Sequence, residues 1–311
     1  MEDLSKLETN LVLREDDGTV GLRLGLIFTA YFRKGYTQPV REAVMEALAL
    51  WLETVSGQVN WVLNPKTEKW RRFKPEMHQA LSQWLEQLPS CNEWSIAFHG
   101  GETNLDASAV FFRALAGADW NPDKKDLDHV RLGLPLTWYA GHKGSFPEFC
   151  RALCAILRPI SGYGGIGFAP ANGDMLATRF ESAQYLLAQR FPGIEMDEPI
   201  THSQYIGDDI KGVNWLTVLG EALVERFGGQ DKLAADLPPA ATLLPYAGGV
   251  IVQSGPRPQL GDTAAGRMPM DYVAVNAVLK PLRATNTRAF HHYGPDTFTR
   301  AAALAWLTRF D

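Results

Sequence analysis

The feature that most constrains the fold is a long, almost uninterrupted apolar segment near the N-terminus, V-G-L-R-L-G-L-I-F-T-A-Y-F at residues 20–32. A run of this kind is typical of a buried strand. It follows a short apolar run at residues 11–13 and the turn Asp16-Asp17-Gly18-Thr19, and Asp-Gly is a strong signal for a β-hairpin. The sequence therefore predicts a hairpin whose second strand is long and buried.

The rest of the first third alternates between helical and strand patterns. Pro39 is well placed at the first position of a helix, and an apolar stripe at helical spacing follows it as far as Trp51. Residues 75–88 predict a second helix. Residues 59–63, 94–98 and 110–115 predict strands.

A second copy of this pattern is predicted from residue 128 onward. Residues 130–139 (V-R-L-G-L-P-L-T-W-Y) match residues 22–31 (L-R-L-G-L-I-F-T-A-Y) without gaps, and a helical stretch follows each copy, after Pro39 and after Pro147. A glycine-rich strand at 164–169 and a helix at 174–189 complete the second copy. We therefore predict an internal repeat, with halves at about 11–120 and 128–200 that pack as a pseudo-dimer and share a core or a sheet.

The last third, residues 205–311, is predicted to form a C-terminal α/β portion. It contains a helix at 213–227, a strand at 248–253, a Gly/Pro-rich loop at 254–269, an apolar segment at 272–282 of either type, and a final helix at 297–310. No long polar linker interrupts the chain. The fold class is therefore α+β, as one compact body and a single domain over residues 1–311.

Composition excludes several classes of protein. With 46% hydrophobic and 21% charged residues the chain is not disordered, and a net charge of −5 argues against direct binding of nucleic acid. The one basic run, residues 69–74, is interpreted as a solvated turn before a helix. A mildly acidic surface suits a basic protein partner, such as an enzyme that itself grips nucleic acid.

Location follows from features that the sequence lacks. The N-terminal segment has no apolar stretch of the kind found in signal peptides, and no segment is apolar enough to cross a membrane. The three cysteines, Cys91, Cys150 and Cys154, do not form a disulfide framework. We expect a cytoplasmic protein without membrane contact, in which Cys150 and Cys154 pack in the core.

No motif in the sequence predicts catalysis, a cofactor or a metal site. The glycine-rich G-Y-G-G-I-G at 162–167 follows a helix rather than a strand, so it is interpreted as a helix-to-strand turn. His99 and Glu102 lie close in sequence, but a zinc site needs three or four ligands. His291 and His292 are adjacent, and neighbouring residues in a strand or helix point in different directions. The nucleophile motif G-x-S-x-G is absent. The expected catalytic, cofactor and metal residues are therefore none.

Clusters of acidic residues are the best candidates for an electrostatic contact surface. Each lies in a loop-like segment with Gly or Pro close by, where simple solvation is the alternative interpretation. The candidate contact residues are Asp16, Asp17, Glu195, Asp197, Glu198, Asp208 and Asp209.

An ordered set of segments resembles a known bacterial family. They are I-K-G-V-N-W-L-T-V-L-G at 210–220, Q-S-G-P-R-P-Q-L-G-D at 253–262, Y-V-A-V-N-A-V-L-K-P-L-R at 272–283 and W-L-T-R-F-D at 306–311, with L-R-L-G-L-I-F and G-Y-G-G-I-G-F-A-P nearer the N-terminus. Together they resemble the type VI secretion immunity family, whose members pair with nuclease toxins of the VRR type.

The resemblance implies an antitoxin rather than an enzyme. It implies a cytoplasmic immunity protein that binds a cognate type VI effector toxin, a VRR-type nuclease, and shields its active site. No catalytic residues are carried over from the family. The residues of the family-like motifs, which we expect to have structural roles, are Gly212, Trp215, Gly255, Pro258, Gly261 and Asp262.

Two other functional classes remain open from the sequence. One is a hydrolase-like enzyme that uses Ser254, His99 or Glu102 in a cleft between the halves. The other is a scaffold component of the secretion machinery, which would bind sheath or spike proteins instead of a toxin.

Overall fold

The long apolar segment forms the central strand of a large antiparallel sheet. The computed structural model describes residues 7, 9–120, 126–142, 145–285 and 296–311, and in it Val20–Phe32 is strand β2. β2 lies between β7 (Asp128–Leu134) and β8 (Ser161–Pro170), and is antiparallel to both. Two strand neighbours and helices on both faces keep almost all of β2 from solvent, as its sequence predicts.

Within the described ranges the sheet has eleven strands, in the order β10-β11-β9-β8-β2-β7-β6-β5-β3-β4, and β1 pairs with β2. Residues from both predicted halves and from the C-terminal portion therefore share one continuous sheet. The remaining strands are β1 (Val12–Arg14), β3 (Trp61–Asn64), β4 (Lys69–Arg72), β5 (Trp94–His99), β6 (Phe111–Ala116), β9 (Leu216–Gly220), β10 (Thr242–Tyr246) and β11 (Gly249–Gln253).

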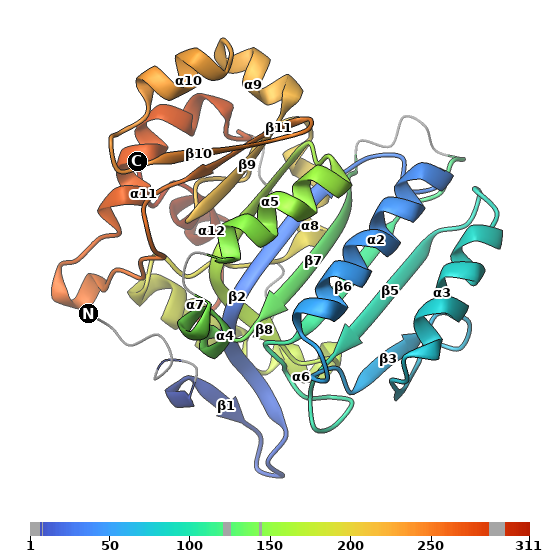
Figure 1. Cartoon of the computed structure of the whole chain (residues 1–311). Coiled ribbons are helices and arrows are strands. Elements are labelled where there is room, and N and C mark those ends of the chain that lie inside the picture. The colour runs from blue at the N-terminus through green and yellow to red at the C-terminus, as the bar shows by residue number, and fades with distance from the viewer. Residues whose placement is uncertain (1–6, 8, 121–125, 143–144, 286–295) are drawn as a thin grey trace.

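Three helices pack on one face of the sheet. They are α2 (Gln38–Thr54), α3 (Glu76–Gln87) and α5 (Ser145–Leu157), which lie in front of the strands in Figure 1. Alternate β2 residues such as Leu24, Leu26 and Phe28 point to this face and join the main core together with Trp51 and Leu153. We call this the helical face of the sheet.

The opposite face carries the other set of β2 side chains. Ile27 and Tyr31 form a smaller apolar cluster with Ile206 of α8 (Pro199–Ile206), and Thr29 lies between them on the strand. The segment before α8 is fixed to the sheet by a parallel bridge between Glu195 and Gly167. We call this the far face. The other helices are α4 (Leu136–Gly141), α6 (Asp174–Thr178), α7 (Glu181–Arg190), α9 (Glu221–Phe227), α10 (Gln230–Asp236), α11 (Met270–Leu279) and α12 (Arg300–Leu307).

The internal repeat is not confirmed. The first copy lies wholly within β2, whereas the second ends its strand at Leu134 and continues as α4, so Thr137 and Tyr139 are helical. Pro135 stands where the first copy has Ile27. Proline has no N–H to continue the ladder, which ends the strand there. The two copies are instead neighbouring antiparallel strands of one sheet.

Several local predictions were also wrong. Residues 213–227, predicted as one helix, form β9 followed by α9, and the helix predicted at 174–189 is divided into α6 and α7. The basic run at 69–74 includes edge strand β4, and the glycine-rich run at 162–167 lies inside β8. Gly165 has a packing reason to be there, because a Cβ at that position would lie 2.1 Å from Asn214 Oδ1.

Candidate functional site

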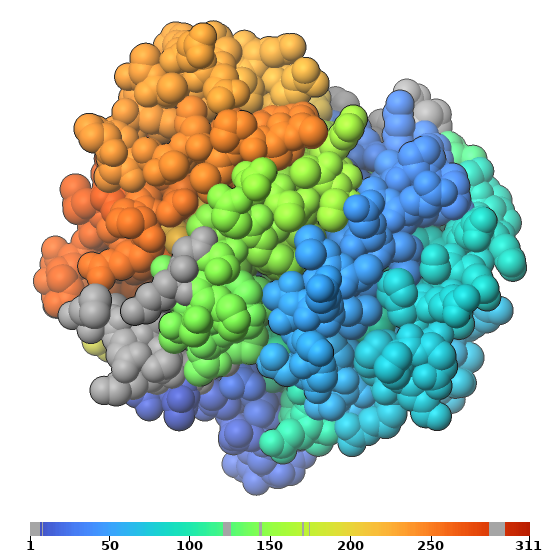
Figure 2. Space-filling view, viewed as in Figure 1, coloured from blue at the N-terminus to red at the C-terminus, as the bar shows by residue number. Residues whose placement is uncertain are grey.

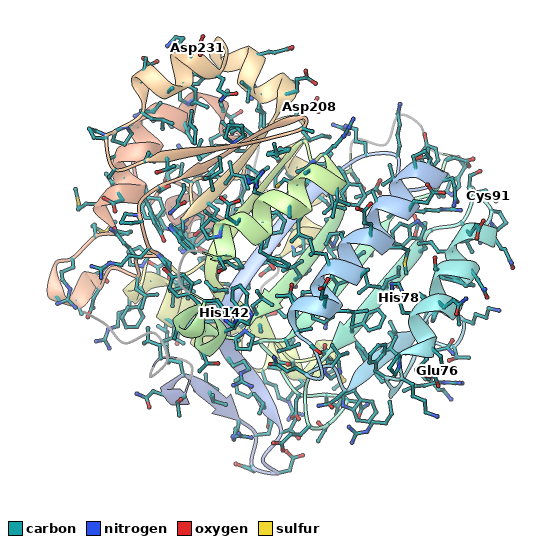
Figure 3. The ribbon with its side chains drawn as sticks, viewed as in Figure 1. Glu76, His78, Cys91, His142, Asp208 and Asp231 are labelled. Carbon is teal, nitrogen blue, oxygen red and sulfur yellow. The ribbon has the colours of Figure 1, made fainter. Side chains whose placement is uncertain are left out.

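The candidate acidic residues do not form one surface. Asp16 and Asp17 lie in the β1–β2 turn, before the first residue of β2, whereas Asp208 pairs with Arg33, just after its last residue. A strand rises about 3.3 Å per residue, so the two groups are roughly 40 Å apart. Figures 1 and 3 show the hairpin and Asp208 at opposite ends of the molecule.

The hairpin turn borders a hollow of about 690 Å³, which we call the hairpin-tip hollow. Glu15 is neutralised by Arg179 at 3.1 Å, whereas Asp16 and Asp17 are exposed. The backbone N–H of Thr19 donates to Asp17 Oδ1 at 2.9 Å and lowers the pKa of Asp17 below its ordinary value. The hollow is lined by Glu15, Asp16, Asp17, Thr19, Leu105, Gly173, Met175, Leu176 and Arg179.

Two large apolar side chains are exposed in the same hollow. Leu105 is 44% and Met175 is 80% exposed. The hairpin beside them is held in place, because Val20 N donates to Asp106 Oδ1 and Arg14 Nη1 donates to Gly18 O. The hairpin-tip hollow therefore combines charge with apolar contact area on a fixed scaffold. In Figure 2 the hairpin projects at the lower edge of the molecule.

Glu195 and Asp197 lie inside the protein, so they are placed neither at an exposed contact surface nor in a solvated loop. Glu195 is 3% exposed, pairs with Lys211 Nζ and accepts from Asn214 Nδ2 at 2.8 Å. Asp197 is 7% exposed and belongs to the network described below. Buried carboxylates need such partners, since isolated charges are costly inside a protein.

Asp197 is the centre of a polar network on the far face. Its Oδ1 accepts from Thr29 Oγ1 at 2.8 Å and from Tyr163 OH at 2.7 Å, and its Oδ2 lies 2.9 Å from Arg131 Nε. These partners come from the adjacent strands β2, β8 and β7. Nothing in the local sequence signals that these three side chains meet, because they come from three separate strands.

The remaining acidic candidates are at the surface but have partners. Asp208 pairs with Arg33 at 2.8 Å, and Asp209 pairs with Arg226 at 2.7 Å. Exposed pairs of this kind contribute about 0–1 kcal/mol, and they reduce the net negative charge that a partner would meet. Glu198 is half-buried just before α8.

Glu198 belongs instead to a second hollow, on the far face, which we call the sheet-face hollow. Its volume is about 380 Å³. Arg113, His129 and Arg131 line it from β6 and β7, and burial together with the nearby Arg131 charge lowers the pKa of His129 from 6.5 to about 3. The hollow is also lined by Leu115, Phe168, Glu181, Asp197, Glu198 and Ile200.

Comparison with known proteins decides the family. The model of the TsiV family, described as type VI immunity for VRR-NUC, matches residues 43–310. The chain belongs to the TsiV family. It is also similar in structure to a Pseudomonas aeruginosa type VI secretion system protein, PA0821, with a TM-score of 0.87 and 24% identity over 99% of this chain and 90% of that one. We find no matching relative among curated proteins.

The TsiV-like motif residues lie mainly in buried or tightly packed positions. Trp215 is fully buried, stacks on Phe146 and donates from Nε1 to Gly255 O at 2.9 Å. A Cβ on Gly255 would lie 2.3 Å from Asp271 Oδ2. Gly261 has a φ of +70°, which favours glycine.

The other motif residues fit the same description. Asp262 is 8% exposed and lies 3.3 Å from Arg190 and 3.4 Å from Arg267, and the Arg190 hydrogen bond lowers the pKa of its carboxyl. Pro258 is buried in the same loop, and Gly212 is half-buried before Trp215.

The three residues of the hydrolase alternative, Ser254, His99 and Glu102, do not converge on one site. Ser254 is fully buried and donates to Asn214 O, and His99 is fully buried with its pKa lowered by burial to about 3. Ser254 follows β11 and His99 ends β5, six strand positions away, which is roughly 29 Å at about 4.8 Å per strand. Glu102 is exposed, beyond the end of β5.

Among the residues that the structure describes, no three His, Cys, Asp or Glu side chains are grouped to hold a metal ion, and Cys150 and Cys154 are buried free thiols. His291 and His292 lie outside these residues. No described helix has the length and apolar character needed to cross a bilayer.

Proposed function

We propose that this TsiV-family protein binds a cognate VRR-type nuclease toxin in the cytoplasm and neutralises it by covering the surface that grips DNA. The observation that carries the proposal is the match to the family over residues 43–310. The net charge of −5 also supports the proposal. A DNA-cleaving domain presents basic groups to phosphate, and an acidic protein is electrostatically complementary to such a surface. Binding of this kind needs no catalytic group in the immunity protein.

The hairpin-tip hollow is the contact surface that we propose for the toxin. Asp16 and Asp17 offer exposed negative charge, and Leu105 and Met175 offer apolar area beside it. Interfaces of high affinity combine a desolvated apolar anchor with a charged rim, which this hollow provides. A basic, partly apolar toxin surface is the complementary partner.

Charge reversal tests this surface. The double variant Asp16→Lys/Asp17→Lys should slow association with the toxin and weaken its affinity by about tenfold or more at low salt, because steering by charge acts mainly on the association rate. The control is Asp231→Lys/Glu225→Lys, which changes net charge equally at exposed sites on α10 and α9. Figure 3 shows Asp231 at the top of the molecule, far from the hairpin.

Stopped-flow association and equilibrium titration at two salt concentrations provide the measurement. Equal losses in the two double variants would mean that only net charge matters and would reject the hairpin tip as the contact. Purification of the tagged protein from cells that contain the toxin separates immunity from a scaffold role. The proposal predicts capture of the toxin, whereas a scaffold would capture sheath or spike proteins.

A further inference from the structure

We propose that the free edge of strand β4 is a docking site for an extended acidic segment of a second protein partner, which adds to the sheet as a further strand. β4 is the last strand in the order of the sheet, and among the described residues it pairs with β3 alone. An unpaired edge of this kind is a template for an incoming strand. In Figure 1, β3 lies at the right-hand end of the sheet, and β4 is the next strand beyond it.

The backbone of β4 offers hydrogen-bonding groups on its outer side. Phe73 N, just after β4, donates to Asn60 O at 2.8 Å, and at the other end of the hairpin Asn64 O accepts from the turn. In an antiparallel pair, alternate residues turn their backbone groups toward the partner strand. Because Phe73 faces β3, Trp70 and Arg72 direct their N–H and C=O groups outward, where an added strand would lie.

The outward-facing residues are held in place by contacts on the far face of the sheet. Trp70 packs edge-to-face on His99, with ring centroids 4.6 Å apart. The Arg72 guanidinium lies 4.1 Å from the centre of the Trp61 ring, a cation–π contact. Trp61 Nε1 in turn donates to Gly101 O at 3.1 Å. The edge is therefore ordered before a partner arrives, which lowers the entropic cost of binding.

Basic side chains surround this edge and lack acidic partners. The segment K-T-E-K-W-R-R-F-K at residues 66–74 contains five basic residues and one acidic residue, in a chain whose net charge is −5. All five are exposed, and none forms an ion pair with another described residue. The five are Lys66, Lys69, Arg71, Arg72 and Lys74. The complementary partner is therefore acidic.

The side chains on the two faces of β4 define the sequence that this edge accepts. Arg71 lies on the helical face with Lys69, because it is opposite Val62 of the main core. Trp70 is half-buried on the far face. A strand that alternates acidic and apolar residues places its carboxylates beside Lys69 and Arg71 and its apolar side chains beside Trp70. The same basic residues repel a second copy of this edge.

This site does not rest on the proposed toxin contact. The hairpin tip is acidic and suits a basic surface, whereas the β4 edge is basic and suits a different partner. β4 lies five strand positions from β2, roughly 24 Å at about 4.8 Å per strand. The test below uses the protein without toxin, so failure of this site and failure of the immunity proposal give different results.

The probe is a short end-blocked peptide of alternating Glu and Val, followed by fluorescence anisotropy. The full-length protein should bind it saturably. The same peptide with every backbone amide N-methylated keeps its charge but has no N–H to donate, and should bind about tenfold or more weakly. A peptide of alternating Lys and Val should not bind. Absence of saturable binding of the Glu/Val peptide, or equal binding of its N-methylated form, would overturn the proposal.

Two variants at one position test the backbone edge itself. Arg72→Ala and Arg72→Pro both remove the guanidinium, but only proline also removes the outward N–H. Proline is tolerated on an edge strand where its N–H side faces solvent, and urea unfolding checks that both variants fold. Arg72→Pro should bind the Glu/Val peptide about fivefold or more weakly than Arg72→Ala. Equal binding would contradict strand addition.

Charge reversal provides a second, independent variant. Arg71→Glu should weaken binding of the Glu/Val peptide by about tenfold or more at low salt. The matched control is Arg257→Glu, which makes the same change of charge at an exposed position in the loop after β11. Similar losses in the two variants would mean that net charge alone matters and would reject the β4 edge.

Nucleic acid and a second copy of this chain are the other occupants that the experiment can reveal. Single-stranded oligothymidylate binds basic surfaces through its phosphates, and tighter binding of it than of the Glu/Val peptide would overturn the proposal. Sedimentation of the protein alone should show no dimer formed through this edge. A concentration-dependent dimer that Arg72→Pro abolishes would also overturn it.

Discussion

Buried histidines make the stability of this protein depend on pH. Burial lowers the pKa of His99 and of His129 from 6.5 to about 3, so the folded state holds both rings neutral over a range in which the unfolded chain protonates them. The unfolded state therefore binds more protons between about pH 6.5 and pH 3. Stability is greatest above pH 6.5 and falls as the pH falls through this range.

His99→Asn should reduce this dependence. Asparagine can keep the acceptor that His99 Nδ1 offers to Gly101 N at 3.1 Å, but it does not titrate. One fewer proton taken up on unfolding should make the slope of unfolding free energy against pH shallower by about 1.4 kcal/mol per pH unit. Urea titrations between pH 4 and pH 6.5 measure it, and a slope equal to that of the parent protein would show that His99 is not held neutral.

Two substitutions of Trp215 should separate the contribution of its hydrogen bond to the free energy of unfolding from the contribution of its packing. Trp215→Phe keeps a ring beside Phe146 but removes the donor to Gly255 O, and should lower the free energy of unfolding by about 1–2 kcal/mol. Trp215→Ala should cost about 3–5 kcal/mol because it also leaves a cavity. Equal losses for both variants in urea unfolding would mean that packing contributes little.

The β1–β2 hairpin is the element on which the proposed toxin contact depends. Gly18 in its turn has a φ of +89°, and a Cβ there would meet no atom within 4 Å. Gly18→Val should therefore cost about 1–2 kcal/mol through backbone strain alone. It should also shift the turn that carries Asp16 and Asp17, and so weaken toxin binding.

Gly57 supplies the matched control for that substitution. It has a φ of +74° and equally open surroundings, but it follows α2, away from the hairpin. Gly57→Val should lower stability by a similar amount and leave toxin affinity unchanged. If both variants bind the toxin as the parent does, the conformation of the hairpin is irrelevant to recognition.

Elements with strong local signals could be predicted from the sequence. The Asp-Gly turn and the apolar run after it gave the hairpin, and Pro39 placed the start of α2 to within a residue. The prediction of one helix over residues 213–227 was wrong because Leu216–Gly220 is a short apolar stretch that fits a helix as well as a strand. Only its pairing with β8 and β11 makes it a strand. The predicted internal repeat was not confirmed because Pro135 ends the strand of the second copy.

The candidate site was harder to predict than the fold, because burial of charge depends on the whole molecule. The residues Glu195 and Asp208 look alike in sequence, in loops with other acids nearby, yet one is buried against Lys211 and the other is exposed beside Arg33. The sheet-face hollow depends on the register that sets Arg113 opposite Arg131, and no local pattern specifies that register.

At the scale of the whole molecule, the hairpin-tip hollow and the sheet-face hollow lie beside one continuous sheet and are lined by different residues. The hairpin-tip hollow is formed by the β1–β2 turn, residues near Leu105 and α6, whereas the sheet-face hollow is formed by β5, β6, β7, the end of α6, α7 and the start of α8.

Titration of the nuclease activity of the cognate VRR-type toxin with this protein tests the central claim most directly. Cleavage of a DNA substrate should fall in proportion to added protein and stop at one equivalent, and excess DNA should slow the inhibition because both ligands compete for the same surface. Full cleavage in the presence of excess protein would contradict the account, whether or not a complex forms.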